Sequence, residues 1–323
     1  MSSNNCENPE PLIFSSPGER LDLALARAAG VSRNVAQSWI AAGQVQVGGV
    51  VMTRSSHRLG QQTALALPLA PRSLTVAPEE IPFNLIFEDE QILVLEKPAG
   101  LATHPAPGRP SGTLVNALLF HLGLEAVEGQ HPEQVRPGIV HRLDQETSGV
   151  MVVAKTPQAL AELSSQFAQR QVTKTYLAIA QGIPRQKLVN LPIGRDPLTR
   201  TRMRVGGIAP REAQTELVVL AQTGKLALVQ AHPHTGRTHQ IRVHLQALGA
   251  PVLADPLYGH ASPLINRLAL HAQSLEFFHP RTGEGLVFYS PVPEDMVLAW
   301  LKAGGKPEDL VSAGSRASPG QFR

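Results

Sequence analysis

Apolar residues recur with two different periods near the start of the chain, and the pattern predicts a small module. Residues 21–28 and 35–39 carry them at helical spacing, and a glycine follows each run. Residues 45–52 alternate or run apolar around a Gly-Gly pair, which is typical of a β-hairpin. Two short helices and a hairpin predict a compact α+β module at residues 18–67.

The segments around this module lack such periods. Residues 1–17 are rich in Asn, Ser, Pro and Glu, which predicts a disordered leader. Four prolines punctuate residues 68–84, which are therefore expected to form a linker. Residues 304–323 are again polar and are expected to form a flexible tail.

Residues 85–303 alternate strand and helix patterns, without an internal repeat, and predict a larger domain. Apolar and alternating runs predict strands at residues 92–95, 173–180, 217–220, 226–230, 275–278 and 286–289. Threonine N-caps predict helices beginning at Thr113, Thr156 and Thr238, and a short helix is predicted near residues 293–301.

Composition narrows the setting in which the chain works. No apolar run is long enough to span a bilayer, and residues 1–17 lack the order of a signal peptide. The single cysteine, Cys6, cannot form an internal disulfide or a cysteine-based metal site. A cytoplasmic protein with no membrane partner is therefore expected.

The choice of arginine over lysine is more informative about function than the net charge. The formal net charge is only +3, but the chain has 22 Arg against 7 Lys. Arginine binds phosphate through two N–H groups and stacks on bases, which suits nucleic acid, although a GC-rich genome also raises arginine content. One segment has a cluster with Asp196 as its only acid, and we predict RNA contacts for Arg195, Arg200, Arg202, Arg204 and Arg211.

A polar loop at residues 138–149 lies between two apolar runs, and it carries Arg142 and Asp144. Loops held by a rigid scaffold often carry chemistry, and core packing does not explain this one. An isolated loop aspartate more often accepts hydrogen bonds from its own backbone, so the loop alone leaves both interpretations open.

Two resemblances to known families change this balance. Residues 18–67 resemble the RNA-binding domain first recognised in a small-subunit ribosomal protein, the S-four type. Residues 85–295 resemble the RluA family of pseudouridine synthases. That resemblance rests on the segments ILVLEKPAGLATHP, GIVHRLDQETSGVMVVAK, KTYLAI and HPHTGRTHQIRVHL, and above all on HRLD followed by TSG.

The RluA resemblance implies an α+β fold: a mixed, mainly antiparallel sheet with flanking helices and a central catalytic cleft. It implies an enzyme that breaks the C1′–N1 bond of a flipped uridine and rejoins the base through C5, without a cofactor. Asp144 matches the catalytic aspartate, Tyr176 the tyrosine that stacks on the base, and Arg242 the arginine that pairs with the aspartate. Arg142 matches the residue inserted into the RNA, and Leu270 an apolar wall of the base pocket.

Several points stay open at this stage. Asp144 can attack C1′ or C6, or stabilise an eliminated intermediate. Large-subunit (23S) rRNA is the favoured target and tRNA the alternative, while a non-catalytic RNA-binding or ribosome-assembly protein is the competing function. Arg237, in the last of the four segments, is counted with the RNA-binding residues, and a monomer suffices for all these roles.

The histidines of residues 232–244 raise one further hypothesis, a metal-dependent hydrolase. His239 and His244 are five residues apart on the predicted helix, and no H-E-x-x-H motif is present. We therefore expect no metal, and interpret His232, His234, His239 and His244 as loop groups near phosphates or as core groups with satisfied hydrogen bonds. His141 is expected to orient its loop.

Overall fold

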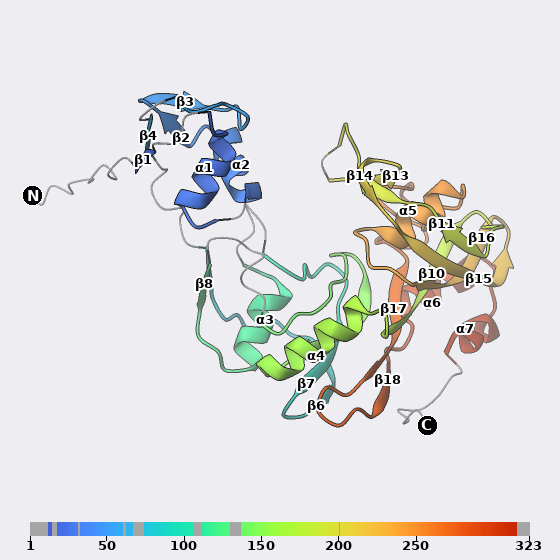
Figure 1. Cartoon of the computed structure of the whole chain (residues 1–323). Helices are drawn as coiled ribbons and strands as arrows, with labels where there is room; N and C mark the ends of the chain where they lie inside the picture. Colours follow the sequence, from blue (N-terminus) through green and yellow to red (C-terminus); the bar gives the residue numbers. More distant parts are fainter. Residues whose placement is uncertain are drawn as a thin grey trace, which may run out of the picture. The chain divides into compact units, whose positions relative to one another are not determined.

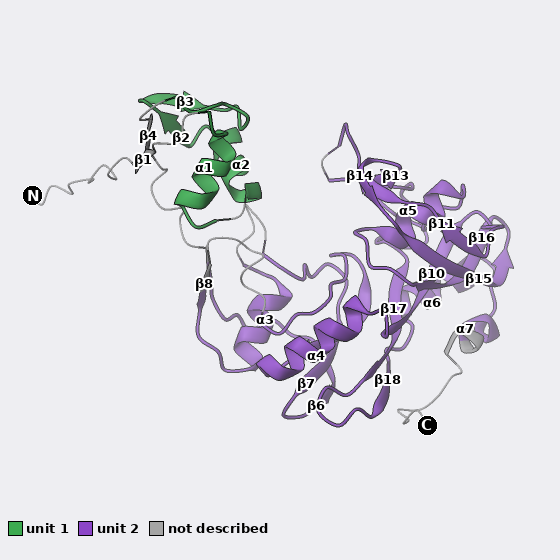
Figure 2. Cartoon of the chain, viewed as in Figure 1, with its two compact units in different colours: residues 1–74, 129–131 green, residues 75–128, 132–323 purple. Residues whose placement is uncertain are grey.

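The computed structural model describes residues 12–14, 18–31, 33–60, 63–66, 74–105, 111–129, 137–199 and 201–314 (Figure 1). The chain divides into two compact units (Figure 2). The first contains residues 1–74 and 129–131, and the second residues 75–128 and 132–323. No helix in the described ranges is long and apolar enough to cross a membrane.

The first unit is a pair of helices with a small sheet. Its helices are α1 (Leu21–Ala28) and α2 (Arg33–Ala41). Its strands, in the order β1-β4-β2-β3, are β1 (Leu12–Phe14), β4 (Thr63–Ala66), β2 (Val45–Val47) and β3 (Val50–Met52). Leu21, Leu25 and Ile40 are fully buried between these elements, so the helical spacing of the sequence reports a true apolar core.

The second unit is built on a nine-stranded sheet, ordered β11-β15-β16-β10-β17-β9-β7-β6, with β18 also paired to β17. Its pairs are antiparallel except β9 with β17, so the prediction of a mixed, mainly antiparallel α+β fold is confirmed. The strands are β6 (Asn84–Glu88), β7 (Ile92–Lys97), β9 (Ser148–Ala154), β10 (Thr173–Gln181), β11 (Leu188–Asn190), β15 (Gln214–Thr223), β16 (Leu226–Pro233), β17 (Leu270–Phe278) and β18 (Gly285–Tyr289).

Helices and two minor sheets complete this unit (Figure 1). The helices are α3 (Leu114–His121), α4 (Pro157–Ala168), α5 (Gln240–Ala247), α6 (Glu294–Lys302) and α7 (Pro307–Gly314). One minor sheet has the order β13-β12-β14, from β12 (Ile193–Arg195), β13 (Met203–Val205) and β14 (Ile208–Arg211). The other pairs β5 (Leu74–Val76) with β8 (Val127–Gly129), two strands that belong to this unit except for Leu74 and Gly129.

Apolar packing makes the centre of the large sheet rigid. Leu177 and Ile179 of β10 are fully buried in a core that also contains Leu245 of α5 and Trp300 of α6. A second core packs β7 and β9 against α4 through residues such as Leu163. Strands that are covered in this way can hold a loop at their ends in a fixed position.

Glycine fixes both ends of the loop at residues 138–149. Gly138 has φ +67°, and a Cβ there would lie 1.8 Å from the carbonyl oxygen of Ala154. Gly149 has φ +121°, and a Cβ there would lie 2.1 Å from the carbonyl oxygen of Ala272, where β9 pairs with β17. Larger residues are excluded at both positions, because the backbones approach too closely for any side chain.

Four sequence predictions need correction. The leader is not wholly disordered, since β1 pairs with β4, and the linker at residues 68–84 contains β5. The tail is not wholly flexible, because α7 forms within it and contacts α6 and β15. α7 is only eight residues long and has an acidic first turn, so its apolar residues do not form a clear helical period in the sequence.

The cap of α5 is the fourth correction. Thr238 was expected to cap this helix, but His239 occupies the N-cap, with φ 57° and no side-chain cap hydrogen bond. The left-handed backbone at His239 separates the exposed Thr238 from the first helical turn.

Candidate functional site

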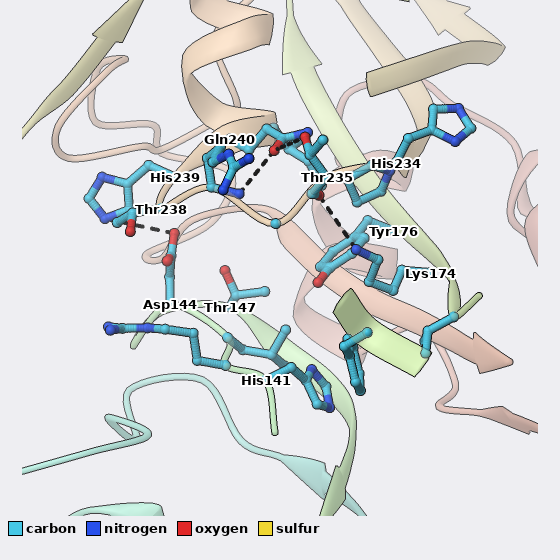
Figure 3. Close-up of a pocket in the computed structure, with 18 of the residues that line it drawn as sticks. His141, Asp144, Thr147, Lys174, Tyr176, His234, Thr235, Thr238, His239 and Gln240 are labelled. Atoms are coloured by element: carbon cyan, nitrogen blue, oxygen red, sulfur yellow. Dashed lines mark hydrogen bonds and ion pairs between the residues drawn. The ribbon is translucent and has the colours of Figure 1, made fainter. Parts of the chain in front are cut away.

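A cavity of about 540 Å³ lies in the second unit and gathers most of the predicted site residues. Its walls come from the loop at residues 138–149, from β10, and from the segment that joins β16 to α5 (Figure 3). Asp144, Tyr176, Arg242, Arg142, Leu270 and Arg237 all line it. These residues are far apart in the sequence, so the fold brings them together.

Backbone contacts hold the aspartate loop in place. Lys97 is fully buried, and its Nζ donates to the carbonyl oxygens of Pro98, Leu101 and Gln145 at 2.7, 2.8 and 3.0 Å. Burial lowers the pKa of Lys97 to about 7. Thr103 Oγ1 donates to the carbonyl oxygen of Leu143, beside Asp144, at 2.9 Å. The carbonyls on both sides of Asp144 are therefore fixed.

Arg242 links two carboxylates. It projects from α5, its side chain is 5% exposed, and its Nη1 donates to Asp144 Oδ2 at 2.9 Å. Its Nε and Nη2 donate to the two oxygens of Asp255 at 2.8 Å each. Burial acts to lower the pKa of Arg242, but the two carboxylates together raise it above its usual value. Arg242 is thus a buried residue of α5 that joins Asp144 to Asp255.

Asp144 points into the cavity toward Thr238 and His239 (Figure 3). Its side chain is 18% exposed, and among the described residues its ion pairs with Arg242 and His239 both involve Oδ2. The contact from His239 Nε2 is longer, at 3.9 Å. Oδ1 therefore has no ion pair with the described part of the chain, on a side chain that lines the cavity.

Tyr176 and Leu270 lie on neighbouring strands, β10 and β17, and form the other wall. Burial, and secondly the charge of Asp144, raise the pKa of the Tyr176 hydroxyl, so it keeps its proton at neutral pH. Leu270 is 3% exposed. An aromatic face and an aliphatic wall beside a carboxylate can enclose a planar base.

His141, at the start of the loop, is held by two contacts. Its Nε2 accepts the N–H of Val152 at 3.1 Å, and its ring stacks on Phe167 at 4.7 Å. Burial lowers the pKa of His141 to about 3, so the ring is neutral. These contacts agree with the expected orienting role.

The remaining predicted arginines fall into separate groups. Arg142 is exposed on the aspartate loop, while Arg237 donates from Nε to the carbonyl oxygen of Glu212 at 2.9 Å. The described arginines of the cluster, Arg195, Arg202, Arg204 and Arg211, lie on or beside the β12–β14 sheet, and none of these four lines the cavity. Arg195, Arg204 and Arg211 are exposed, Arg202 is half-buried, and Arg200 lies outside the described residues.

The histidines serve different purposes. His244 is fully buried, and its two ring nitrogens bond to Thr215 Oγ1 and to the carbonyl oxygen of Leu191. His234 is exposed. Within the described ranges, no group of three or more His, Cys, Asp or Glu residues is arranged to hold a metal ion.

Two residues of the site had no signal in the sequence. Asp255 is fully buried between Arg242 and the N–H groups of Leu257 and Tyr258. Tyr258 bonds to His239, and the guanidinium of Arg242 lies 5.0 Å from its ring. A single loop carboxylate and a single tyrosine have no periodic pattern, so only the fold identifies them.

Comparisons with known proteins agree with this geometry. Residues 91–247 match the family model described as RNA pseudouridylate synthase, and residues 19–63 match the S4 domain. An uncharacterized RNA pseudouridine synthase of Aquifex aeolicus is 42% identical over 91% of this chain and 98% of its own length. The ribosomal large subunit pseudouridine synthase D of Xanthomonas campestris is 39% identical over 87% and 88%.

The solved structures give the same result. Human RNA pseudouridylate synthase domain containing 1 superposes with a TM-score of 0.55 and 27% identity, over 75% of this chain and 98% of that one. The catalytic fold, the aspartate cavity and the relatives' identity across most of the chain all agree. The chain therefore belongs to the RNA pseudouridine synthases, and is an enzyme that isomerises uridine in RNA, with an S4 domain before its catalytic domain.

Proposed function

We propose that this enzyme modifies uridines of large-subunit (23S) rRNA, with Asp144 as the catalytic carboxylate. The observation that carries the catalytic assignment is the one-sided anchoring of Asp144. Arg242 holds Oδ2 at 2.9 Å, while the side chain stays 18% exposed to the cavity. A carboxylate held in this way keeps one oxygen available beside the glycosidic bond.

The other residues act on the flipped nucleotide. Tyr176 stacks on the uracil, and Leu270 closes the pocket on the apolar side. Arg142 is exposed, lines the cavity and fills the space that the base leaves in the RNA. Asp144 assists cleavage of the C1′–N1 bond; the base then turns, C5 bonds to C1′, and the C5 proton moves to N1 through solvent or a site group.

The binding surfaces support a structured RNA target. The exposed Arg195, Arg204 and Arg211 place positive charge on the β12–β14 sheet, and the S4 domain supplies a second RNA-binding unit. The Xanthomonas relative is named as a ribosomal large subunit pseudouridine synthase, and its alignment covers most of both chains. This similarity favours the large ribosomal subunit as the target. A single copy contains all the site residues, so we propose that a monomer is active.

Two measurements test this proposal. The Asp144→Asn variant should form no pseudouridine in cognate RNA, whereas Asp295→Asn, at an exposed pair with Arg267, should behave as wild type. Wild-type activity of Asp144→Asn would refute the catalytic assignment. Pseudouridine mapping in cells that lack the gene should show marks missing from large-subunit rRNA, and marks missing only from tRNA would refute the rRNA target.

A further inference from the structure

We infer that Tyr258 is a positioning residue that holds His239 with its Nε2–H facing Asp144. Tyr258 follows β16 and α5 in the chain and is 5% exposed, and it is not among the residues that line the cavity. The inference rests on the proposed catalytic role of Asp144. In this inference His239 is a second hydrogen-bond donor to Asp144 Oδ2, the oxygen that Arg242 already binds.

A directed chain of hydrogen bonds sets the position of the proton on His239. The N–H of Met203 donates to the Tyr258 hydroxyl oxygen at 2.8 Å, and the same hydroxyl lies 2.8 Å from His239 Nδ1. Among the described residues, His239 Nδ1 is the one acceptor within hydrogen-bond distance of this buried hydroxyl, so the hydroxyl donates its hydrogen to Nδ1. Nδ1 is then the acceptor, and the ring proton is assigned by this network to Nε2.

The charge state of both groups agrees with this assignment. Burial raises the pKa of Tyr258, so its hydroxyl keeps the hydrogen that it donates. Burial also lowers the pKa of His239, although Asp144 and Asp255 oppose this shift while Arg242 and Arg142 add to it. A neutral imidazole with one N–H is therefore the form that faces Asp144.

The geometry directs that N–H at the carboxylate. His239 Nε2 lies 3.9 Å from Asp144 Oδ2, longer than a hydrogen bond, and such contacts in free enzymes often shorten when the substrate binds. His239 also has φ 57°, which costs a non-glycine residue on the order of 1 kcal/mol. The surrounding contacts must hold the residue in this conformation.

Tyr258 also contacts the other partner of Asp144. The guanidinium of Arg242 lies 5.0 Å from the Tyr258 ring, and that of Arg202 lies 5.3 Å from it. Arg202 directly precedes β13, whose Met203 supplies the N–H to the Tyr258 hydroxyl. One tyrosine thus orders both groups that approach Asp144 Oδ2 and ties them to the arginine-bearing sheet.

Histidine NMR tests the hydrogen-bond network without any turnover. We expect the His239 signals of the wild-type enzyme, assigned by their loss in His239→Asn, to show one tautomer protonated at Nε2. In Tyr258→Phe the donor to Nδ1 is gone, so the signals should shift toward exchange between tautomers. Tyr289→Phe, on β18, should leave them unchanged. Protonation at Nδ1 in the wild type, or an unchanged Tyr258→Phe spectrum, would overturn the inference.

Kinetics test the effect on the reaction. Loss of one hydrogen bond predicts that Tyr258→Phe lowers the single-turnover rate roughly 3- to 10-fold with an unchanged Kd for RNA. His239→Gln places an amide near the position of Nε2 and should retain more activity than His239→Asn, which favours the left-handed backbone but is too short. Equal rates for Tyr258→Phe and wild type, or for the two His239 variants, would contradict the inference.

The two proposals can fail separately. If Asp144→Asn is fully active, the catalytic assignment fails, while the NMR result still reports whether Tyr258 sets the tautomer of His239. If Asp144→Asn is inactive but the Tyr258 and His239 variants are unaffected, only the positioning role is wrong.

Discussion

Asp255 binds Arg242 through two parallel hydrogen bonds of 2.8 Å, from Nε and Nη2, while Nη1 donates to Asp144 Oδ2 at 2.9 Å. The arrangement decides how the Asp144 carboxylate is held. A guanidinium free to turn could bind both oxygens of Asp144 with its two-point fork. Asp255 occupies the Nε–Nη2 side of the guanidinium, and Arg242 reaches Asp144 through Nη1 alone, at Oδ2.

We expect Asp255→Asn to impair both stability and turnover. Asp255 and Arg242 are both buried, and removing one partner of a buried ion pair typically costs about 3–5 kcal/mol in the free energy of unfolding. Arg242 can then turn its fork to Asp144 and engage both oxygens, which lowers the single-turnover rate.

Urea denaturation and single-turnover assays measure these effects. Glu90→Gln is the control, because Glu90 pairs with Arg281 at the surface, where both side chains are exposed and such pairs contribute about 0.2–1 kcal/mol. Similar losses in the free energy of unfolding would show that the Asp255–Arg242 pair stabilises the fold no more than a surface pair does.

Substitutions of Tyr176 should separate binding from chemistry. Tyr176→Phe keeps the aromatic face, so its Kd for RNA should match the wild type while its turnover falls with the lost hydroxyl. Tyr176→Leu loses base stacking, worth about 1–3 kcal/mol, which corresponds to a roughly 5- to 150-fold higher Kd. Gel-shift titration and single-turnover rates measure the two effects, with Tyr289→Phe as control. A Kd for RNA that is the same in Tyr176→Leu as in the wild type would refute stacking.

Salt dependence should distinguish two arginines that are two residues apart. Arg204 is exposed on β13, whereas Arg202 is half-buried with its guanidinium 5.3 Å from the Tyr258 ring. We expect Arg204→Gln to flatten the plot of log K against log salt concentration by about 0.7–0.9, the loss of one phosphate contact. Arg202→Gln should leave the slope unchanged. The opposite ranking would place Arg202, and not Arg204, on the RNA.

Acid should destabilise the fold through His141. Burial lowers the pKa of His141 to about 3 in the folded protein, against about 6.5 for an unfolded histidine. Between these pH values only the unfolded chain binds the proton. The contribution of His141 is therefore complete above pH 6.5 and declines by up to about 1.4 kcal/mol per pH unit as the pH falls toward 3.

The His141→Gln variant isolates this effect, because its amide oxygen can still accept the N–H of Val152. Urea denaturation from pH 7 to pH 4 should give a shallower decline in unfolding free energy for His141→Gln than for the wild type. Parallel curves would mean that His141 is protonated equally in the two states.

Much of the fold and part of the site could be predicted from the sequence. Apolar periods report local burial, so α1, α4, β7 and β10 were found where the pattern placed them. The glycines at 138 and 149 enclosed the aspartate loop, and they are required there by close backbone contacts. The roles of Asp144, Tyr176 and Arg242 came from resemblance to a family, because no local pattern distinguishes a catalytic side chain from an ordinary one.

The sequence by itself thus determined the elements, the RNA-binding module and the loop that carries Asp144. Only the tertiary structure brought Asp144 to Arg242, 98 residues away, and placed Asp255 and Tyr258 behind them. It also turned Arg202 toward Tyr258 while Arg204 stayed exposed, and it moved the cap of α5 from Thr238 to His239. Periodicity records which face of an element is buried. The partners across that face depend on strand order and loop geometry, which neighbouring residues do not encode.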